Sequence, residues 1–275
     1  MQQLSSFEEL QKQIAEIRAL RLGSITNFFP DIVKNGLWIE KRDLFTERVN
    51  NTLFIVKQSA KFWNVFYYST SIEALGIDLG LFQAQHSGKT LIYDLVGRQI
   101  QCQPIVELFT AKGCKEATSF VRMNRINEAM DYTPDSTIHY ATEVNLPIIS
   151  KQLHQYFNEE TEQIPYDEEL LDYTNQNHVL VCEENGVMTG FLIFELNSTT
   201  LYLRYWFTHP DYRDRKVGSR LLRRFFEEGK NTKRQLFWVI QSNENAIKRY
   251  RHYGFKEEDM YDYVMQYNYD NYFKM

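Results

Sequence analysis

The chain has 275 residues, of which 43% are hydrophobic and 24% charged, a balance that is typical of folded globular proteins. At roughly 150 residues per domain, this length predicts one large domain or two modest ones. Only 12 Gly and 6 Pro are present, which excludes collagen-like and low-complexity chains. No apolar run approaches the roughly 20 residues that span a bilayer, and the polar N-terminus lacks the apolar core of a signal peptide. We therefore expect a cytoplasmic protein without a membrane partner.

The net charge of −5 is unevenly distributed along the chain. Between Arg213 and Arg234, nine basic residues stand against three acidic ones, so this segment carries +6 and the remainder −11. Such an island suggests an anionic ligand at one place, whereas a nucleic-acid partner would need a broader basic face. The cysteines Cys102, Cys114 and Cys182 show neither a metal-ligand spacing nor a disulfide framework. We expect reduced thiols, no metal and no nucleic acid.

The first 130 residues show one series of helical and strand periodicities. Apolar residues at helical spacing predict a helix over 6–22, followed by a short one over 28–36. Two β-branched and aromatic runs, 52–58 and 62–69, predict an antiparallel hairpin. The elements expected next are a helix over 71–85, a strand over 90–96, a helix over 104–112 and a strand over 117–123.

The polar, proline-containing segment 131–136 is the best candidate for a linker. After it, the Asn185-Gly186 pair between two apolar runs is a strong hairpin signal, because both residues tolerate positive φ. The order of elements predicts two domains, 1–133 and 134–275. The elements expected in the second are strands over 138–142, 178–183, 187–196, 200–208, 235–241 and 261–267, and helices over 146–157, 167–174, 217–228 and 244–252.

One short pattern occurs twice. Residues 112–116 (Lys-Gly-Cys-Lys-Glu) end a short helix and precede a strand, and residues 253–257 (Tyr-Gly-Phe-Lys-Glu) do the same about 141 residues later. In each case an apolar strand precedes the helix. This self-similarity indicates an internal duplication, and chance recurrence of a common supersecondary unit is the alternative.

The sharpest local feature is a basic loop with one glycine between a strand and a helix. Residues 213–219 (Arg-Asp-Arg-Lys-Val-Gly-Ser) follow the strand 200–208 and overlap the start of the helix 217–228. A helix N-terminus presents unpaired N–H groups and the positive end of the dipole, which together bind phosphate oxygens. Gly218 would let an anion approach the backbone closely. The alternative is a solvated basic helix face.

A second motif follows about 25 residues later, where residues 243–255 have the pattern N-x-x-A-I-x-x-Y-x-x-x-G-F. Here the chain resembles the GNAT superfamily of acyl-CoA-dependent N-acetyltransferases, over roughly 138–267. The basic loop resembles the family's phosphate loop, R/Q-x-x-G-x-G/A, with Arg213 in the first position and Gly218 in the last. Lys216 stands where the family's first glycine is usual. Its backbone N–H remains and its charge would assist, but its effect on CoA affinity stays open.

The resemblance implies acetyl-CoA as co-substrate and an amine acceptor that the sequence does not identify. The start of the helix 217–228 and the basic side chains before it would bind the pyrophosphate of CoA. The end of the strand 200–208 would hydrogen-bond the pantetheine arm and the acyl carbonyl. The residues expected to contact the cofactor are Trp206, Phe207, Thr208, Arg213, Arg215, Lys216, Val217, Gly218, Ser219 and Asn243. The last of these would equally cap its helix.

The resemblance implies that Tyr250 is the general acid that protonates the departing thiolate, since a phenol is neutral at pH 7 and donates its proton at short range. A core aromatic is the alternative role. Direct attack of the amine needs no covalent nucleophile. No general base is assigned, and both histidines considered are interpreted as structural. The groups weighed are Glu143, Glu183, Glu195, His178 and His209.

The implied fold is α/β (α+β), with a mixed central sheet flanked by helices, over residues 134–275. Residues 1–133 lack a basic glycine loop and are interpreted as a smaller, degenerate GNAT-like α/β domain without cofactor binding. A non-catalytic acyl-CoA-binding or regulatory module is the alternative function, because of Lys216 and the unassigned base. An aminoacyl-tRNA-dependent transferase also uses paired folds of this kind, but the negative net charge and the short chain argue against it. The oligomeric state does not follow from the sequence.

Overall fold

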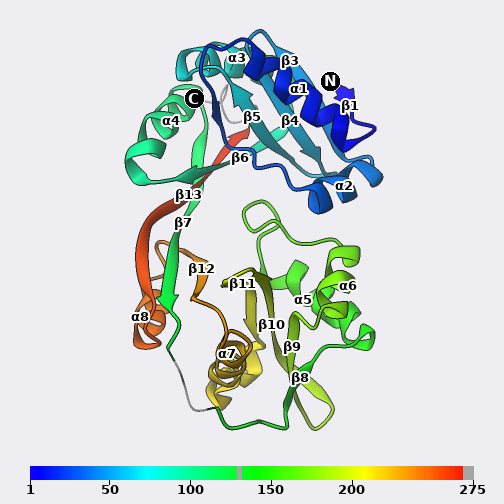
Figure 1. The fold of residues 1–275 in the computed structure, drawn as a ribbon, viewed down its shortest axis with the longest axis vertical. Coiled ribbons are helices and arrows are strands. Elements are labelled where there is room, and N and C mark those ends of the chain that lie inside the picture. The colour runs from blue at the N-terminus through cyan, green and yellow to red at the C-terminus, as the bar shows by residue number, and fades with distance from the viewer. Residues whose placement is uncertain (129–131, 269–275) are drawn as a thin grey trace. The chain divides into compact units, whose positions relative to one another are not determined.

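Strands and helices form where the sequence periodicity places them in nearly every case. In the computed structural model, which describes residues 1–128 and 132–268, the chain divides into two compact units. Unit 1 comprises Met1–Phe120 and Asp259–Met275, and unit 2 comprises Val121–Glu258. Each unit has its own helices and its own part of the sheet (Figure 1). Each also has its own hydrophobic core.

Unit 1 is built from short helices around antiparallel and parallel strands. Its elements are β1 (Gln2–Gln3), α1 (Phe7–Ala19), β2 (Ile25–Thr26), α2 (Ile32–Glu40), β3 (Leu44–Val49), β4 (Thr52–Gln58), β5 (Trp63–Ser69), α3 (Ile72–Gln85), β6 (Thr90–Gly97), α4 (Gln99–Ala111) and most of β13 (Lys256–Asn268). The strand order is β1-β3-β4-β5-β6-β13, with β2 beside β5. Strands β3, β4 and β5 are antiparallel, β5 and β6 are parallel, and β13 is antiparallel to β6.

Helices cover both faces of this sheet, because the side chains of β5 alternate between two apolar layers. Val65 and Tyr67 lie in a core with α3 and α4, where the Tyr67 ring is 6.0 Å from that of Phe109. On the other face, Phe66 stacks on Trp38 of α2 with a centroid distance of 6.0 Å. All residues of β5 are buried as a result.

Unit 2 has the same kind of layers. Its elements are the end of β7 (Lys115–Ile126), β8 (Ile138–Tyr140), a 3-10 turn η1 (Glu143–Asn145), α5 (Leu146–Tyr156), α6 (Asp167–Asn175), β9 (Val179–Glu184), β10 (Val187–Asn197), β11 (Thr200–Thr208), a 3-10 turn η2 (Pro210–Arg215), α7 (Val217–Glu228), β12 (Arg234–Ile240) and α8 (Glu244–His252). The strand order is β7-β12-β11-β10-β9-β8. Strands β8 to β11 are antiparallel, and β11 and β12 are parallel.

The two faces of this sheet carry different helices. Helices α5 and α6 cover one face through a core that includes Phe191 and Phe207. Helix α7 covers the other, where the ring of Phe225 lies 6.1 Å from that of Phe194 on β10. The apolar side chains of α7 are buried on one side of the helix, which leaves its basic side chains for the other.

The order of elements occurs twice, as the sequence suggested. Two helices, three antiparallel strands, a helix, a parallel strand and a helix appear as α1 α2 β3 β4 β5 α3 β6 α4 and again as α5 α6 β9 β10 β11 α7 β12 α8. The strand that ends each series contributes to the other unit. Residues 121–126 of β7 lie beside β12 in unit 2, and residues 259–268 of β13 lie beside β6 in unit 1.

This exchange differs from the contiguous boundary at 133/134 expected from the sequence. Of the described residues, 121–128, 132 and 133 fall in unit 2, and 259–268 fall in unit 1. Local sequence carries no sign of the exchange, because the pairing of β13 with β6 joins residues that are far apart in the chain. Of the expected linker 131–136, Asp131 lies outside the described residues.

Several elements of unit 1 differ from the expectation. Helix α2 begins after Asp31, whose side chain accepts the N–H groups of Val33 and Lys34, and so it lies later than 28–36. Strands β1, β2 and β3 are absent from the expected elements. Helix α4 begins at Gln99 and contains Pro104, earlier than the expected start at 104. Among the described residues, no helix is both long enough and apolar enough to cross a membrane.

Candidate functional site

Two parallel strands of unit 2 separate shortly after they begin. Strand β11 pairs with β10 along its length, but with β12 only from Thr200↔Arg234 to Tyr202↔Leu236. Beyond Tyr202, the described part of the chain gives β11 no ladder partner on the β12 side. The backbone groups of such an edge can hydrogen-bond an extended ligand. Residues 203–208 of β11 and residues 237–240 of β12 lie where the two strands diverge, and we call them the wedge.

A β-bulge lies at the start of the wedge. The register between β10 and β11 passes from Ile193↔Tyr205 to Phe194↔Leu203, so Arg204 has no opposite residue on β10. A bulge bends a strand and increases its twist. The extra residue therefore accounts for the divergence of β11 from β12 at this point.

Beyond the bulge, the side chains of β11 alternate between the two helical layers. Tyr205 and Phe207 belong to the core with α5 and α6. On the other face, a Cβ on Gly218 would lie 3.1 Å from the indole of Trp206 and 3.2 Å from Oγ1 of Thr208. Gly218 therefore allows the start of α7 to pack against β11, which is a different role from the close approach of an anion expected from the sequence.

The N-terminus of α7 presents backbone donors without a capping side chain. Lys216 occupies the N-cap position, and its side chain makes no capping hydrogen bond. Its backbone is left-handed, with φ 58° and ψ 19°. A glycine adopts this conformation readily, whereas a residue with a Cβ does so at a cost of about 1–2 kcal/mol. The N–H groups of Val217, Gly218 and Ser219 have no acceptor within the helix.

The basic side chains around this terminus divide into paired and exposed groups. Arg220 is held by two carboxylates at 2.7 and 2.5 Å. Arg215 lies 3.7 Å from Glu184, but its side chain is 61% exposed. Arg213 and Lys216 are exposed. Part of the +6 island is thus used within the fold, and the exposed charge directly before the helix lies in residues 213–216.

Tyr250 of α8 faces the same layer as the start of α7. Its ring centroid lies 4.5 Å from that of Phe237 on β12 and 5.7 Å from that of Trp206. Burial raises the pKa of Tyr250 to about 12, against the opposing effect of the Arg249 charge. The phenol is therefore protonated at neutral pH and can donate. Because Trp206 lies beside both Gly218 and Tyr250, the structure brings the loop and this tyrosine to one side of the wedge.

Two of the expected cofactor contacts also hold α7 and α8 in place. Asn243 caps α8, since its Oδ1 accepts the N–H of Ala246 at 3.1 Å. The hydroxyl of Tyr253 donates to Oγ of Ser219 at 2.9 Å. These two bonds use neither the side-chain NH2 of Asn243 nor the backbone N–H of Ser219. A structural role and a role toward a ligand are therefore compatible at both residues.

Carboxylates lie on the opposite face of β11, toward α5 and α6. Glu195 of β10 accepts the hydroxyl hydrogen of Tyr173 at 2.7 Å and lies 3.3 Å from Nε of Arg204. Glu183 pairs instead with a histidine of β8 at 3.2 Å, and Glu143 is exposed at the start of η1. Of the three glutamates considered from the sequence, the structure brings Glu195 to the bulge.

A second carboxylate at this face is not among the residues considered from the sequence. Glu162 lies in the loop between α5 and α6, where burial raises the pKa of its carboxyl although the N–H of Asn158 donates to it at 2.8 Å. The Tyr205 hydroxyl anchors the loop through bonds of 2.9 Å to the main-chain oxygens of Glu162 and Gln163. The acidic sequence of this loop is typical of a solvated segment, so only the contact with β11 reveals its position.

The two histidines pack among aromatic rings. His178 lies 5.0 Å from Phe194, and burial lowers the pKa of its imidazole. His209 lies 6.4 Å from Phe207. Both geometries agree with the structural roles expected from the sequence.

Unit 1 contains a comparable divergence of parallel strands. Strand β5 pairs with β6 over only two positions, ending at Asn64↔Ile92. Since β4 pairs with the whole of one edge of β5, the short strand β2 must pair with the same edge as β6, from Ile25↔Ser69 to Thr26↔Tyr68. The far end of this edge is therefore covered by the chain itself.

The side chain of Asn27 closes the space between β2 and β6. Its Oδ1 accepts the N–H of Tyr67 at 2.7 Å, and its Nδ2 donates to the carbonyl oxygen of Asp94 on β6 at 3.0 Å. Asn27 is itself buried. In unit 1, residues 25–27 thus take the place on the strand edge that the wedge leaves open in unit 2.

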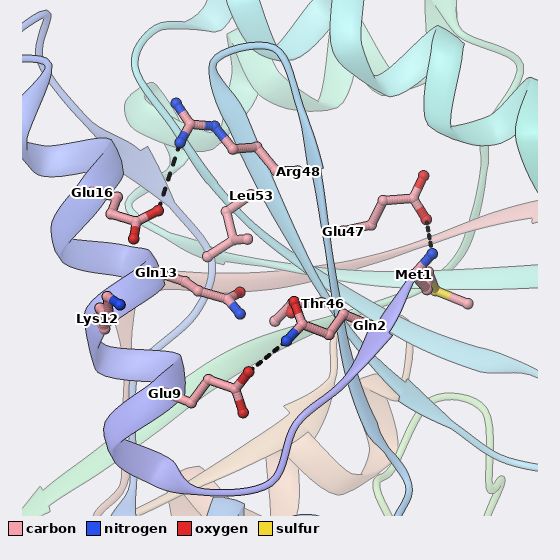
Figure 2. Close-up of a pocket in the computed structure, with 10 residues that line it drawn as sticks. All are labelled: Met1, Gln2, Glu9, Lys12, Gln13, Glu16, Thr46, Glu47, Arg48 and Leu53. Atoms are coloured by element: carbon pink, nitrogen blue, oxygen red, sulfur yellow. Dashed lines mark hydrogen bonds and ion pairs between the residues drawn. The ribbon is translucent and has the colours of Figure 1, made fainter.

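A separate pocket of about 500 Å³ lies in unit 1 between α1 and β3 (Figure 2). Its polar groups largely pair with one another. Gln2 donates to Glu9 at 2.6 Å, Arg48 lies 3.7 Å from Glu16, and the terminal ammonium lies 3.3 Å from Glu47. These pairs join the N-terminal segment to β3, and the pocket contains none of the residues singled out from the sequence.

The wedge, the loop and Tyr250 lie in a part of the chain that matches a known family. Residues 147–255 match the acetyltransferase (GNAT) family. The matched segment, which is less than half of the chain, is similar to that family. A stretch of 95 residues is 28% identical to an uncharacterised N-acetyltransferase of Methanocaldococcus jannaschii. The match covers 31% of this chain and 42% of that protein, so the chain spans less than half the length of this curated relative.

Solved structures show the same fold beyond the matched segment. A GCN5-related N-acetyltransferase from Sphaerobacter thermophilus superimposes with a TM-score of 0.58 at 13% identity, over 78% of this chain and 76% of that one. A tandem GNAT protein from the clavulanic acid biosynthesis pathway gives a TM-score of 0.52 at 11% identity, over 80% of each chain. At these identities the likeness concerns the fold alone. It confirms the expected GNAT fold, with a mixed sheet flanked by helices.

Proposed function

We propose that the protein is an N-acyltransferase that transfers the acetyl group of acetyl-CoA to a primary amine, and that the reaction takes place in unit 2. The observation that carries this proposal is the meeting of three features at one side of the wedge. These are the unpaired edge of β11, the uncapped N-terminus of α7 and the half-buried, protonated phenol of Tyr250. The match of residues 147–255 to the GNAT family supports it.

The residues present fit CoA in their chemistry. Its pyrophosphate would accept hydrogen bonds from the amides of 217–219, with the charges of Arg213, Arg215 and Lys216 nearby. The first turn of α7 carries no carboxylate that would repel it. The pantetheine arm would pair with the main chain of 206–208, as an extended peptide pairs with a strand edge. Asn243 would add a side-chain donor at the start of α8.

The chemistry would be direct attack of a neutral amine on the thioester carbonyl. The C–N bond forms, a main-chain N–H of the wedge stabilises the oxyanion, and the C–S bond then breaks. Tyr250 would give its proton to the departing thiolate. The proton lost by the attacking nitrogen leaves through a carboxylate or water, and the phenolate regains a proton from solvent. Atoms and charge therefore balance without a covalent enzyme intermediate.

Unit 1, in this proposal, is a degenerate copy that takes no cofactor. The helix that corresponds to α7 is α3, and its N-terminus is capped by Ser71, whose hydroxyl accepts the N–H of Ala74 at 3.1 Å. Glu73 in the first turn adds a negative charge. Residues 25–27 cover the strand edge. Both places that would hold CoA are thus occupied by groups of the chain itself, and we expect one CoA per chain.

Titration calorimetry with CoA, and release of free thiol from acetyl-CoA in the presence of an amine panel, test the proposal together. We expect one CoA per chain and turnover with at least one class of amine. Absence of both binding and turnover would refute the proposed function. Two CoA molecules per chain would instead refute the assignment of unit 1.

The alternative function is a non-catalytic acyl-CoA-binding or regulatory module, which the strained Lys216 at the loop favours. The variant Tyr250→Phe keeps the ring against Phe237 but removes the proton donor. If the tyrosine is the general acid, kcat falls about 10²- to 10⁴-fold while the affinity for CoA is kept. CoA binding without any turnover in the wild type would favour the alternative, and unchanged turnover in the variant would make Tyr250 a core residue.

A further inference from the structure

Arg204 is the bulged residue at which β11 leaves β12, and it lies on the face of the sheet that carries α5 and α6. Its guanidinium lies 5.2 Å from the ring centroid of Tyr202 and 6.0 Å from that of Tyr205. The side chain is 23% exposed. An arginine that is so largely removed from water needs partners for its five N–H donors.

The carboxylate beside Arg204 is already well supplied with donors. Glu195 receives the hydroxyl of Tyr173 at 2.7 Å on one oxygen and the side-chain NH2 of Asn197 at 3.2 Å on the other. Its distance to Nε of Arg204 is 3.3 Å, without hydrogen-bond geometry. A closed structural ion pair would show short, parallel bonds between the guanidinium and the carboxylate.

Arg204 itself is poorly supplied with acceptors. Within residues 1–128 and 132–268, its buried Nε makes no hydrogen bond, and its Nη1 donates to the hydroxyl of Tyr202 at 3.4 Å. The balance of donors and acceptors at this pair is therefore uneven, since Glu195 is satisfied and Arg204 is not. The group that this face can still bind is an anion with oxygen acceptors.

We propose that Arg204 binds a carboxylate carried by one of the two substrates of the reaction proposed above, on which this inference rests. Arg204 precedes Trp206 by two residues, or about 7 Å along an extended strand. The carboxylate would therefore lie a few bonds from the reacting carbon. Two sources fit this geometry: an acceptor that is an amino acid, and an acyl group that ends in a second carboxylate.

The acceptor is the source that the surroundings favour. Glu162 lies on the same face as Arg204, so an amino acid would find an oxygen acceptor for its amine and a guanidinium for its carboxylate. Arg204 acts in this proposal as a specificity-determining residue, since it selects the substrate and takes no proton.

Matched substrate pairs test the inference with the full-length wild-type protein. Amino acids are compared with their amides using acetyl-CoA, and succinyl-CoA is compared with acetyl-CoA using a simple amine. We expect kcat/KM to be about 10- to 100-fold higher for the carboxylate-bearing member of one pair. The pair that shows the preference identifies the source. Equal rates within both pairs would overturn the inference and leave the proposed function intact, whereas absence of turnover with every pair would refute both.

The variant Arg204→Met should remove this preference by lowering kcat/KM for the carboxylate-bearing substrate, with the neutral analogue within about threefold of the wild type. Arg204→Lys should keep part of the preference, because a charge remains without the planar fork. The exposed Arg223 on α7 serves as the matched control, and Arg223→Met should keep the wild-type preference. Loss of activity with all substrates alike, at unchanged CoA affinity, would mean that Arg204 only supports the bulge.

Discussion

The left-handed backbone of Lys216 allows a sharp test of the loop, because two substitutions separate the backbone from the charge. Lys216→Gly and Lys216→Ala both remove the ammonium group. At φ 58° the alanine keeps the Cβ conflict, about 1–2 kcal/mol, whereas glycine relieves it. Glycine in turn loses about 0.5–1 kcal/mol more chain entropy on folding. The glycine variant should therefore be more stable than the alanine variant by up to about 1.5 kcal/mol.

Thermal unfolding monitored by circular dichroism measures this difference, with an expected Tm about 2–4 °C higher for the glycine variant. Lys248 in the exposed part of α8 is the matched control, because there the alanine variant should be the more stable one. Both Lys216 variants should bind CoA about fivefold more weakly at low salt, since one exposed charge near a phosphate contributes at most about 1 kcal/mol. If glycine and alanine at residue 216 differed in stability by the same amount and sign as glycine and alanine at residue 248, the strain at residue 216 would be refuted.

Three further predictions concern packing and pH. Gly218→Ala should lower the free energy of unfolding in urea by about 1–3 kcal/mol and weaken CoA binding, because the alanine methyl group would press on Trp206. Unchanged stability would contradict the close packing of α7 on β11. Asp262 is buried beside Asp94, and burial raises the pKa of its carboxyl. When the folded pKa of a carboxyl lies above the unfolded one, the folded state is favoured at low pH and loses this advantage as the pH rises. Asp262→Asn should therefore raise the free energy of unfolding more at pH 8 than at pH 5. An equal effect at both pH values would contradict the burial of this carboxyl. Asn27→Ala should lower the free energy of unfolding by about 1–3 kcal/mol, since it leaves buried backbone groups unpaired. Calorimetry should still find one CoA per chain for this variant. Wild-type stability would show that Asn27 is not needed between β5 and β6.

The loop and the tyrosine motif could be found in the sequence because each is local. The residue types of 213–219 and 243–255 keep their meaning at fixed spacing, and the strand and helix that position them have clear periodicities. The packing role of Gly218 has no such local signal. Its neighbour across the packing interface is Trp206, twelve residues away on another element, and only the fold shows that the missing Cβ makes room for an indole.

Other parts of the site depend on pairings between distant segments and leave no local signal. The bulge at Arg204 appears only when β10 and β11 are placed in register. Asn27 looks like an ordinary polar residue in a loop until β5 and β6 are seen on either side of it. Glu162 lies in an acidic stretch whose contact with β11 is made by the hydroxyl of Tyr205. Each of these depends on tertiary hydrogen bonding that periodicity does not encode.

The exchange of the last strands sets an order on the folding of the chain during its synthesis. Unit 1 receives residues 259–268 as the strand beside β6, and these residues follow the whole of unit 2 in the chain. A ribosome therefore releases all of unit 2 before unit 1 can complete its sheet, and until then β6 has an open edge toward other chains. For the same reason, neither half of the gene can be lost without removing a strand from the other unit. A half that binds no cofactor would then persist because the working half is built partly from its sequence.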